Sequence, residues 1–277
     1  MWVFPRLARV RLTIGYAVAL VAVTAALVLA GPRMRDRALA LASTNLHNLE
    51  HGRIATLLGS AFLDSTGLIY LWLPWLIALL AIAELFWRSG RLLAIFISGH
   101  IVTTLLVAVG LEIGLWLHWL PPSISRATDV GMSYGAMTVL GALTSAVPSR
   151  IKPVWLGWWL AAAAAVVAVS VRADDFTEVG HAVAMVLGML ISRWLAPPGR
   201  WGPLRLVLFA FGVGFGFMLL ANTGALMQVA VPAGIVGAAI GWVLMRRQAK
   251  ASARASSQSG RQESGGCESS SPGSSQS

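Results

Sequence analysis

The chain has little charge, almost no cysteine and few histidines. Charged residues make up 12% of its 277 residues and hydrophobic residues 57%, and the mean hydropathy is +0.72. Composition therefore excludes an ordinary soluble domain, which needs a more charged surface. The single cysteine, Cys267, lies in a polar C-terminal stretch, so no disulfide framework exists and we expect a solvated thiol without a role. The sequence shows no clustered His, Cys or carboxylate ligands, so we expect no metal and no cofactor.

Acidic residues are scarcer than basic ones. The chain has 21 Lys and Arg against 11 Asp and Glu, a formal net charge of +10. An excess of this size suits nucleic-acid binding. Here, however, the basic residues fall in short loops between apolar segments and in the tail, which is the positive-inside pattern of membrane proteins. We therefore expect no nucleic-acid partner.

Long apolar runs dominate the rest of the sequence. About 17 to 25 mostly apolar residues cross a bilayer as a helix, and the alternating ten-residue pattern of a membrane barrel is absent. The sequence predicts an all-α, polytopic membrane protein with helices at about 12–30, 68–87, 92–117, 129–148, 154–171, 178–195, 204–221 and 226–245. The polar stretch 31–64 is expected to be a structured surface loop with a short amphipathic piece.

These segments divide the chain into four regions. We expect a cytoplasmic N-terminus at residues 1–11, a six-helix membrane core at 12–195, two additional transmembrane helices at 196–247 and a disordered cytoplasmic tail at 248–277, where Ser, Gly and Gln dominate. Lys and Arg gather in alternate loops, which places both termini in the cytoplasm of a multi-pass protein of the cell membrane. Only the loop at 31–64, with four arginines, dissents.

Ser133 and His181 are the candidate catalytic residues. In this topology the fourth and sixth helices both run inward from the outer surface, and each residue lies about one turn inside its helix. A serine hydroxyl becomes a good nucleophile when a base takes its proton, and histidine is the usual base near neutral pH. A serine and a histidine at one depth are therefore the minimum equipment for hydrolysis within a membrane.

Small residues beside both positions favour the close helix approach that this chemistry needs. They are Gly131, Gly135 and Ala136 on the serine helix and Gly180, Ala184 and Gly188 on the histidine helix. The start of the serine helix also offers backbone N–H groups for an oxyanion. Against this, a serine among glycines is usually a packing residue, and Glu178 is expected to form a capping box with Asp175 rather than to orient His181. The G-x-S-x-G match at 131–135 is accidental, because a nucleophile elbow follows a strand.

These pieces, in this order, resemble the rhomboid family of intramembrane serine proteases over residues 45–195. The matching features are Gly131-Met132-Ser133 for the family's G-x-S, His181 with Gly188 for its sixth-helix histidine and small-residue face, Glu84 with Trp87-Arg88-Ser89-Gly90-Arg91 for the end of its second helix, and residues 53–62 for the segment leading into that helix. The resemblance implies a rhomboid fold and a Ser-His dyad, with Ser133 as nucleophile and His181 as base. It also implies a transmembrane protein client within the lipid.

The sequence departs from the family at three places. The family has glycine directly after the serine, whereas this chain has Tyr134 and then Gly135. Its second-helix His and Asn, four residues apart, correspond to Leu68 and Trp72. The aromatic residue one turn after the serine corresponds to Met137. A catalytically inactive rhomboid-fold protein that binds membrane helices is therefore the alternative hypothesis.

A small transporter is the third hypothesis. It expects paired broken helices and ionisable groups at mid-membrane, but only His100, Glu112 and Asn222 are available and they form no repeat. His100 is expected to be a packed, hydrogen-bonded histidine. Glycines four apart in the last two helices, such as Gly212 and Gly216 or Gly237 and Gly241, predict close packing of these helices with each other or with a partner. The oligomeric state stays open.

Overall fold

The structure, a computed structural model, describes residues 8–53, 55–63, 69–127, 130–173, 176–197 and 201–266. All regular secondary structure in these residues is helical. The α-helices are α2 (Arg11–Ala30), α3 (Pro32–Ala42), α4 (Leu46–Glu50), α5 (Thr56–Gly59), α6 (Ile69–Trp116), α7 (Ser133–Ala142), α8 (Lys152–Ser170), α9 (Phe176–Ile191), α10 (Pro203–Leu220) and α11 (Gly224–Gly266). Short 3₁₀ helices are η1 (Ala8–Val10), η2 (Ser60–Phe62), η3 (Pro122–Arg126), η4 (Leu143–Ser145), η5 (Val171–Ala173) and η6 (Ser192–Trp194).

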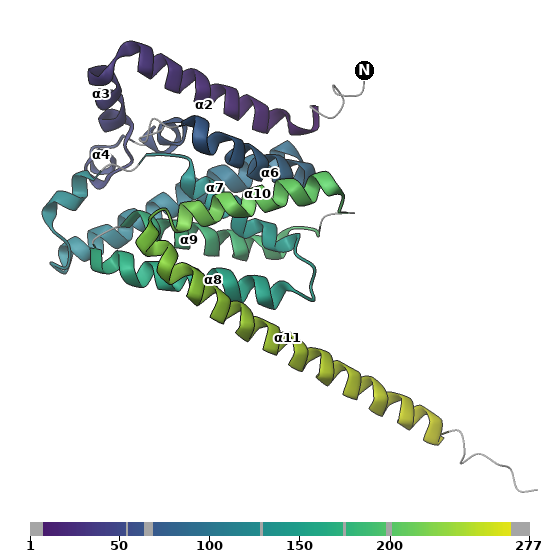
Figure 1. Cartoon of the computed structure of the whole chain (residues 1–277). Coiled ribbons are helices and arrows are strands. Elements are labelled where there is room, and N and C mark those ends of the chain that lie inside the picture. Colours follow the sequence, from purple (N-terminus) through teal and green to yellow (C-terminus); the bar gives the residue numbers. More distant parts are fainter. Residues whose placement is uncertain are drawn as a thin grey trace, which may run out of the picture.

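Five of the described helices are long and apolar enough to cross a membrane: α2 with η1, α6, α8, α10 and the first part of α11. The prediction of an all-α, polytopic membrane protein is confirmed. Helix α6 contains both the second and the third predicted segments. Arg88, with φ 66° and ψ 163°, interrupts it at the predicted basic turn. Its two halves run in opposite directions (Figure 1).

A buried carboxylate joins the start of α2 to the end of the first half of α6. Glu84 accepts hydrogen bonds from the backbone N–H groups of Leu12 and Thr13, both at 2.9 Å, and from the Thr13 hydroxyl at 2.7 Å. It also accepts from Ser89 Oγ at 2.6 Å. The first N–H groups of a helix have no intrahelical acceptor, and a negative charge there is favourable. Glu84 therefore caps α2 and fixes it beside the break in α6.

Helix α7 lies at the centre of the bundle. Its residues from Tyr134 to Ala142 are all buried, and it packs against α6, α9 and α10. A helix that is apolar on every side is typical of such a position. Because α7 is short, η4 extends it before the chain turns to α8. The helix that begins at Ser133 is therefore held in place by three neighbouring helices.

The two helices beyond the predicted core are α10 and α11. Their glycines contact that core and not each other. In α10, a Cβ on Gly212 would lie 3.0 Å from Leu79 Cα, and one on Gly216 would meet Leu140 of α7. In α11, Gly237 meets the backbone of Gly157 in α8. The partners of these small residues thus lie in the same chain, because close helix contact needs small residues facing backbone.

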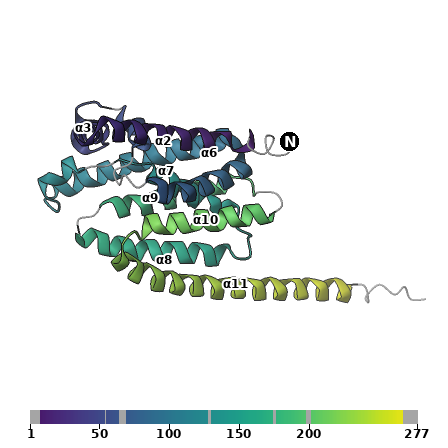
Figure 2. The ribbon, with the colours of Figure 1, turned by 45° about the horizontal axis from the view of Figure 1, so that its top comes forward.

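Helix α10 lies between the first half of α6 and α8. Phe211 packs on Trp75 of α6, with ring centroids 4.8 Å apart, while Phe209 packs on Trp155 of α8 at 5.5 Å. Figure 2 shows the same order, from α2 and α6 through α10 to α8 and α11. The second and fifth predicted helices are therefore separated by an element from outside the six-helix core.

Of the loop at 31–64 and the C-terminal tail, only the tail differs from the prediction. The loop expected at 31–64 is structured as predicted, with α3, α4, α5 and η2 in its described part. The tail expected to be disordered from Gln248 instead continues α11 to Gly266, where alternate alanines raise helix propensity. Cys267 and the residues after it lie outside the described residues. The start of α2 and the end of α11 lie at the same end of the bundle (Figure 1).

Candidate functional site

Ser133 is the first residue of α7 and is half-buried. The helix was expected to begin near Asp129, which lies outside the described residues, and Ser133 to lie one turn inside it. Helix α7 begins later because Gly131 adopts φ +125°, a conformation that suits glycine and interrupts a helix. The Gly131 N–H donates to the Ser60 carbonyl at 2.9 Å, so η2 fixes the entry to α7.

His181 lies in the second turn of α9 and is 3% exposed. Its Nδ1 is 3.0 Å from Glu178 Oε2, and Glu178 Oε1 accepts a hydrogen bond from Asn222 Nδ2 at 2.6 Å. Since an ionised carboxylate can only accept, Nδ1 carries a proton, and in the neutral imidazole it is Nε2 that has the free electron pair. Within the described part of the chain, Nε2 is buried without a hydrogen-bond partner.

The Glu178 carboxylate has a role that was not expected of it. It is 0% exposed and contacts His181 and Asn222, and so orients the imidazole. Asp175, the other member of the expected capping box, lies outside the described residues. Sequence reasoning noted Asn222 only as a polar group for transport. Asn222 lies just after α10 and 44 residues from Glu178 in the sequence, so no local pattern joins the two.

Helices α7 and α9 run in the same direction with matching levels. A Cβ on Gly180 would meet the Tyr134 ring, and one on Gly188 would meet the Thr138 carbonyl. Residue numbers thus increase in the same direction along both helices. The residues next to Ser133 and His181 are in contact, so the two helices enter the bundle at one level, as the predicted topology requires.

The structure brings Ser133 and His181 to this level without joining them. No hydrogen bond links their side chains in the described residues. Tyr134 packs on His181 instead, edge to face, with ring centroids 5.7 Å apart. Neighbouring residues on a helix point about 100° apart, so Ser133 and Tyr134 project in different directions, and the Tyr134 ring is the one that contacts the imidazole.

The remaining predicted packing residues have two different roles. Gly180 and Gly188 allow α9 to touch α7, and Ala184 is 0% exposed on the same helix. Gly135 faces α6, since a Cβ there would lie 2.9 Å from the Phe96 ring. The small residues therefore seat α7 against both α9 and α6.

A second buried histidine lies on the other side of Tyr134. His100 Nε2 is 3.1 Å from Ser60 Oγ, and the His100 and Tyr134 ring centroids are 6.4 Å apart. The prediction of a packed, hydrogen-bonded His100 is confirmed. Through Ser60, this contact fixes η2, which in turn holds Gly131 just before Ser133.

The oxyanion groups expected from the family are replaced. Leu68 lies outside the described residues and Trp72 packs against the core. Met137, which stands where the family has an aromatic residue, is 0% exposed. The N–H groups of the first turn of α7 remain, since the first backbone bond of that helix runs from Ala136 N to Met132 O. These groups are the donors closest in sequence to Ser133.

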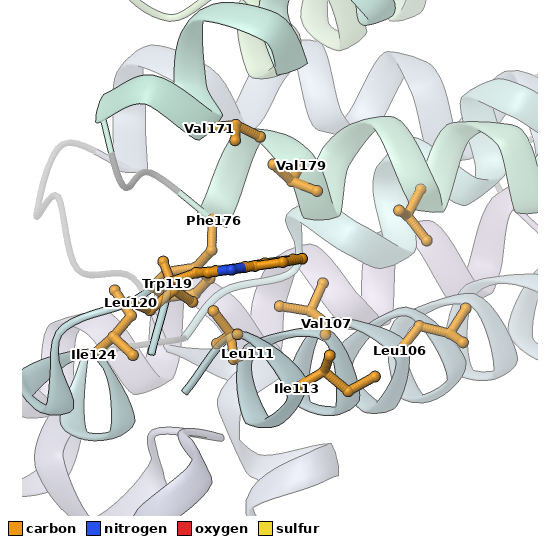
Figure 3. Close-up of a pocket in the computed structure, with 13 residues that line it drawn as sticks. Leu106, Val107, Leu111, Ile113, Trp119, Leu120, Ile124, Val171, Phe176 and Val179 are labelled. Carbon is orange, nitrogen blue, oxygen red and sulfur yellow. The ribbon is translucent and has the colours of Figure 1, made fainter. Parts of the chain in front are cut away.

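An apolar cavity of about 340 Å³ lies on the opposite face of α9 (Figure 3). It is bounded by the second half of α6, by Trp119 and Leu120 beyond it, and by Phe176 and Val179 of α9. The residues that line it are all apolar or glycine. It can hold an apolar group, but neither Ser133 nor His181 lines it.

Comparison with known proteins supports the family suggested by the half-buried serine, the oriented histidine and the central short helix. A model of the rhomboid-like protein family matches residues 9–197. The chain therefore belongs to the rhomboid-like family, whose match ends before α10 and α11. No curated protein and no solved structure matches it.

Proposed function

We propose that the protein is a rhomboid-like intramembrane serine protease that cleaves transmembrane client proteins, with Ser133 as nucleophile and His181 as base. The observation that carries the proposal is the state of His181. Its Nδ1 is held by Glu178 while its Nε2, the atom that would take a proton, is buried without a partner among the described residues. The packed His100 likewise has one buried nitrogen, Nδ1, without a partner among the described residues, so the feature that distinguishes His181 is the Glu178 carboxylate that orients its ring.

The reaction is acyl transfer in two steps. Ser133 Oγ attacks the scissile carbonyl carbon as its proton passes to His181 Nε2, and the imidazolium then gives that proton to the leaving amine. Water repeats the sequence on the acyl-enzyme and releases the carboxylic acid. Glu178 stabilises the imidazolium, so the dyad gains a third, orienting member. The first N–H groups of α7 are the candidate donors to the oxyanion.

Catalysis requires one change in the site. Ser133 Oγ must approach His181 Nε2 to about 2.6–3.2 Å. The ring of Tyr134 lies against the imidazole, so a shift of this ring accompanies that approach. A client segment that pairs with the start of α7 would supply the contacts for the shift.

The setting of this reaction is a bilayer, which supplies lipid contacts around the helices. We place the protein in the cell membrane with both termini in the cytoplasm. The support is the distribution of Lys and Arg among the loops, together with the position of the start of α2 and the end of α11 at one end of the bundle. Ser133 then lies near the outer surface.

The test is cleavage of a reporter protein with one transmembrane helix, reconstituted with the purified protein in liposomes. Ser133→Ala and His181→Ala are expected to abolish cleavage while leaving the protein folded. Ser123→Ala, an exposed serine of η3, is the matched control and should cleave normally. Cleavage that persists in the Ser133→Ala protein would refute the assignment.

The competing function is a rhomboid-fold protein that binds membrane helices without cutting them. It rests on Tyr134, whose ring occupies the face of His181, and on the replaced oxyanion donors. It predicts that Ser133→Ala leaves client capture unchanged, whereas bulky residues at Gly135 or Ala184 disturb it. Co-purification of the reporter with these variants separates the two functions.

A further inference from the structure

Three metal-ligating side chains gather on α4 and its C-cap, in the loop between α2 and α6. His47 and Glu50 lie in α4 and His51 is its C-cap residue, so they stand at positions i, i+3 and i+4, which share one face of a helical turn. One ligand atom from each lies within 4.8 Å of the others. The expectation from the sequence that no such ligands cluster is therefore wrong for this turn, where the spacing is short and local.

The turn that carries these residues is held firmly. Asn45 caps it by accepting a hydrogen bond from the Asn48 N–H at 2.9 Å. The buried Asn48 side chain donates to the carbonyls of Ala40 at 3.0 Å and Ser43 at 2.7 Å, and Arg53 N–H donates to the Asn48 carbonyl. Asn48 faces the protein, whereas Glu50 and His51 are exposed and His47 is half-buried. A site on such a fixed turn needs little ordering when it binds an ion.

The two imidazoles are already prepared for coordination. The His51 ring contacts the His47 carbonyl through Nδ1, at 2.7 Å. Because a carbonyl only accepts, Nδ1 carries the proton and Nε2 is the ligand atom. Metal-binding histidines commonly donate their other nitrogen to a carbonyl in this way. The His47 and His51 ring centroids are 4.3 Å apart, so both rings border the same small space.

We propose that His47, Glu50 and His51 bind a divalent transition-metal ion, with Zn²⁺ as the best fit. Two imidazoles and one carboxylate are a common zinc set, with bonds of about 2.0–2.2 Å and a fourth position for water or another ligand. Closing the ligand atoms around the ion needs only rotation of side chains, and Glu50 and His51 are exposed. Hard cations such as Mg²⁺ prefer all-oxygen sites and fit less well.

The ion would stiffen the loop above the serine helix. Nine residues after His51, Ser60 contacts both His100 and Gly131, which precedes α7. A ligand that binds the folded loop stabilises it by mass action. Metal binding thus acts on the segment that fixes the entry to α7, although the binding itself does not depend on the proposed protease activity.

The test is titration of the purified, tag-free full chain in detergent with Zn²⁺, followed by calorimetry, and with Co²⁺, followed by its visible absorption. Wild type is expected to bind one ion per chain with micromolar or tighter Kd. The His47→Ala/His51→Ala protein should bind at least about 100-fold more weakly, and Glu50→Gln about 10-fold more weakly. His118→Ala, an exposed histidine beyond α6, is the matched control and should bind like wild type.

Two results would overturn the proposal: no stoichiometric binding by wild type, or equal Kd values for wild type and the double variant. Helical content by circular dichroism is measured for each protein. Should the double variant fail to fold, Glu50→Gln and the single His51→Ala, both at exposed side chains, decide the matter by the same comparison of Kd.

Discussion

At the scale of the residue, the main feature is a run of hydrogen bonds from the exposed Asn222 through the buried Glu178 to the buried His181. Each link is a short hydrogen bond, and Glu178 and His181 are otherwise surrounded by apolar helices. Burial of a carboxylate is costly unless its lone pairs are satisfied, and here both oxygens have a donor. These hydrogen bonds therefore fix one orientation of the imidazole, with Nδ1 toward Glu178.

Replacement of Glu178 should separate orientation from simple presence of the histidine. In Glu178→Gln the amide cannot accept from both His181 and Asn222, so we expect cleavage of the reporter to fall by about 10²-fold or more with little change in client capture. The loss of the hydrogen bonds should lower the free energy of unfolding by about 1–3 kcal/mol.

The measurements are turnover in liposomes and unfolding in mixed detergent. His118→Ala is a suitable control, because it replaces a histidine that is remote from these hydrogen bonds. Unchanged turnover in a folded Glu178→Gln protein would remove Glu178 from the proposed mechanism.

The residues of the site could be predicted from the sequence only in part. Ser133 and His181 follow from a short motif, an intramembrane histidine and equal depth in the predicted topology. The contacts of Tyr134 and Asn222 could not be predicted, because they depend on the rotation of each helix about its axis and on contacts between distant segments. The polar turn at His47 carries a readable signal in its sequence, the i, i+3, i+4 spacing of His47, Glu50 and His51.

At the scale of the element, the bundle is assembled where backbones touch. The contacts of α7 with α9 and of α8 with α11 both depend on glycines whose added Cβ atoms would meet a backbone carbonyl. In lipid there is little hydrophobic drive between helices, so close van der Waals contact at small residues supplies the attraction. Substitution at these points should be far more harmful than at lipid-facing ones.

Gly188 offers a direct test of this view. A methyl group there would meet the Thr138 carbonyl of α7, so Gly188→Ala should lower the free energy of unfolding by about 1–3 kcal/mol. Gly15→Ala in α2 is the matched control, since nothing lies within 4 Å of its added Cβ, and it should be neutral or slightly stabilising. Equal stability of the two variants in a detergent unfolding titration would contradict the packing argument.

The position of α10 predicts how a client enters. A client that passes between the second and fifth predicted helices must displace α10, which fills that space. A Cβ on Gly212 lies 3.3 Å from Leu79 Cβ, close to the spacing of a disulfide. In a Cys267→Ser background, oxidised Leu79→Cys/Gly212→Cys should cleave its client at least about tenfold more slowly than the same protein after reduction.

Reaction of Ser133 with a small probe serves as the control for this cross-link, because it needs no client entry and should be unaffected. Equal cleavage before and after reduction would show that the client takes another path.

The elements themselves were largely readable from the sequence. Long apolar runs identify membrane helices because the bilayer fixes their length, and the basic turn at Arg88 marks a break. The start of α7 was placed too early because the backbone conformation of Gly131 is set by its contact with Ser60. The glycines of α10 and α11 predicted close helix contact but not which helix is contacted, because that depends on how the whole bundle assembles.

At the scale of the whole molecule, the chain is an all-helical membrane protein of the rhomboid-like family with two added helices. One of these, α10, reaches the interior and ends beside Asn222, while the other, α11, extends beyond the bundle (Figure 1). The additions therefore differ in role: α10 contributes to the core and to the orientation of His181, whereas α11 covers α8.

The proposed topology predicts the accessibility of the single thiol. A membrane-impermeant maleimide should label Cys267 only after cells are permeabilised, because the C-terminus is expected in the cytoplasm. Ser123→Cys in a Cys267→Ser background is the control and should be labelled in intact cells. Labelling of Cys267 in intact cells would reverse the proposed orientation and place Ser133 near the inner surface.

The most direct test of the central claim is covalent labelling of the purified protein by a tagged fluorophosphonate, which reacts with activated serines. Wild type should be labelled at Ser133, and both Ser133→Ala and His181→Ala should lose the label, since the hydroxyl is reactive only when the imidazole takes its proton. A folded wild-type protein that takes no label, or a His181→Ala protein that is labelled as strongly as wild type, would contradict a histidine-activated serine.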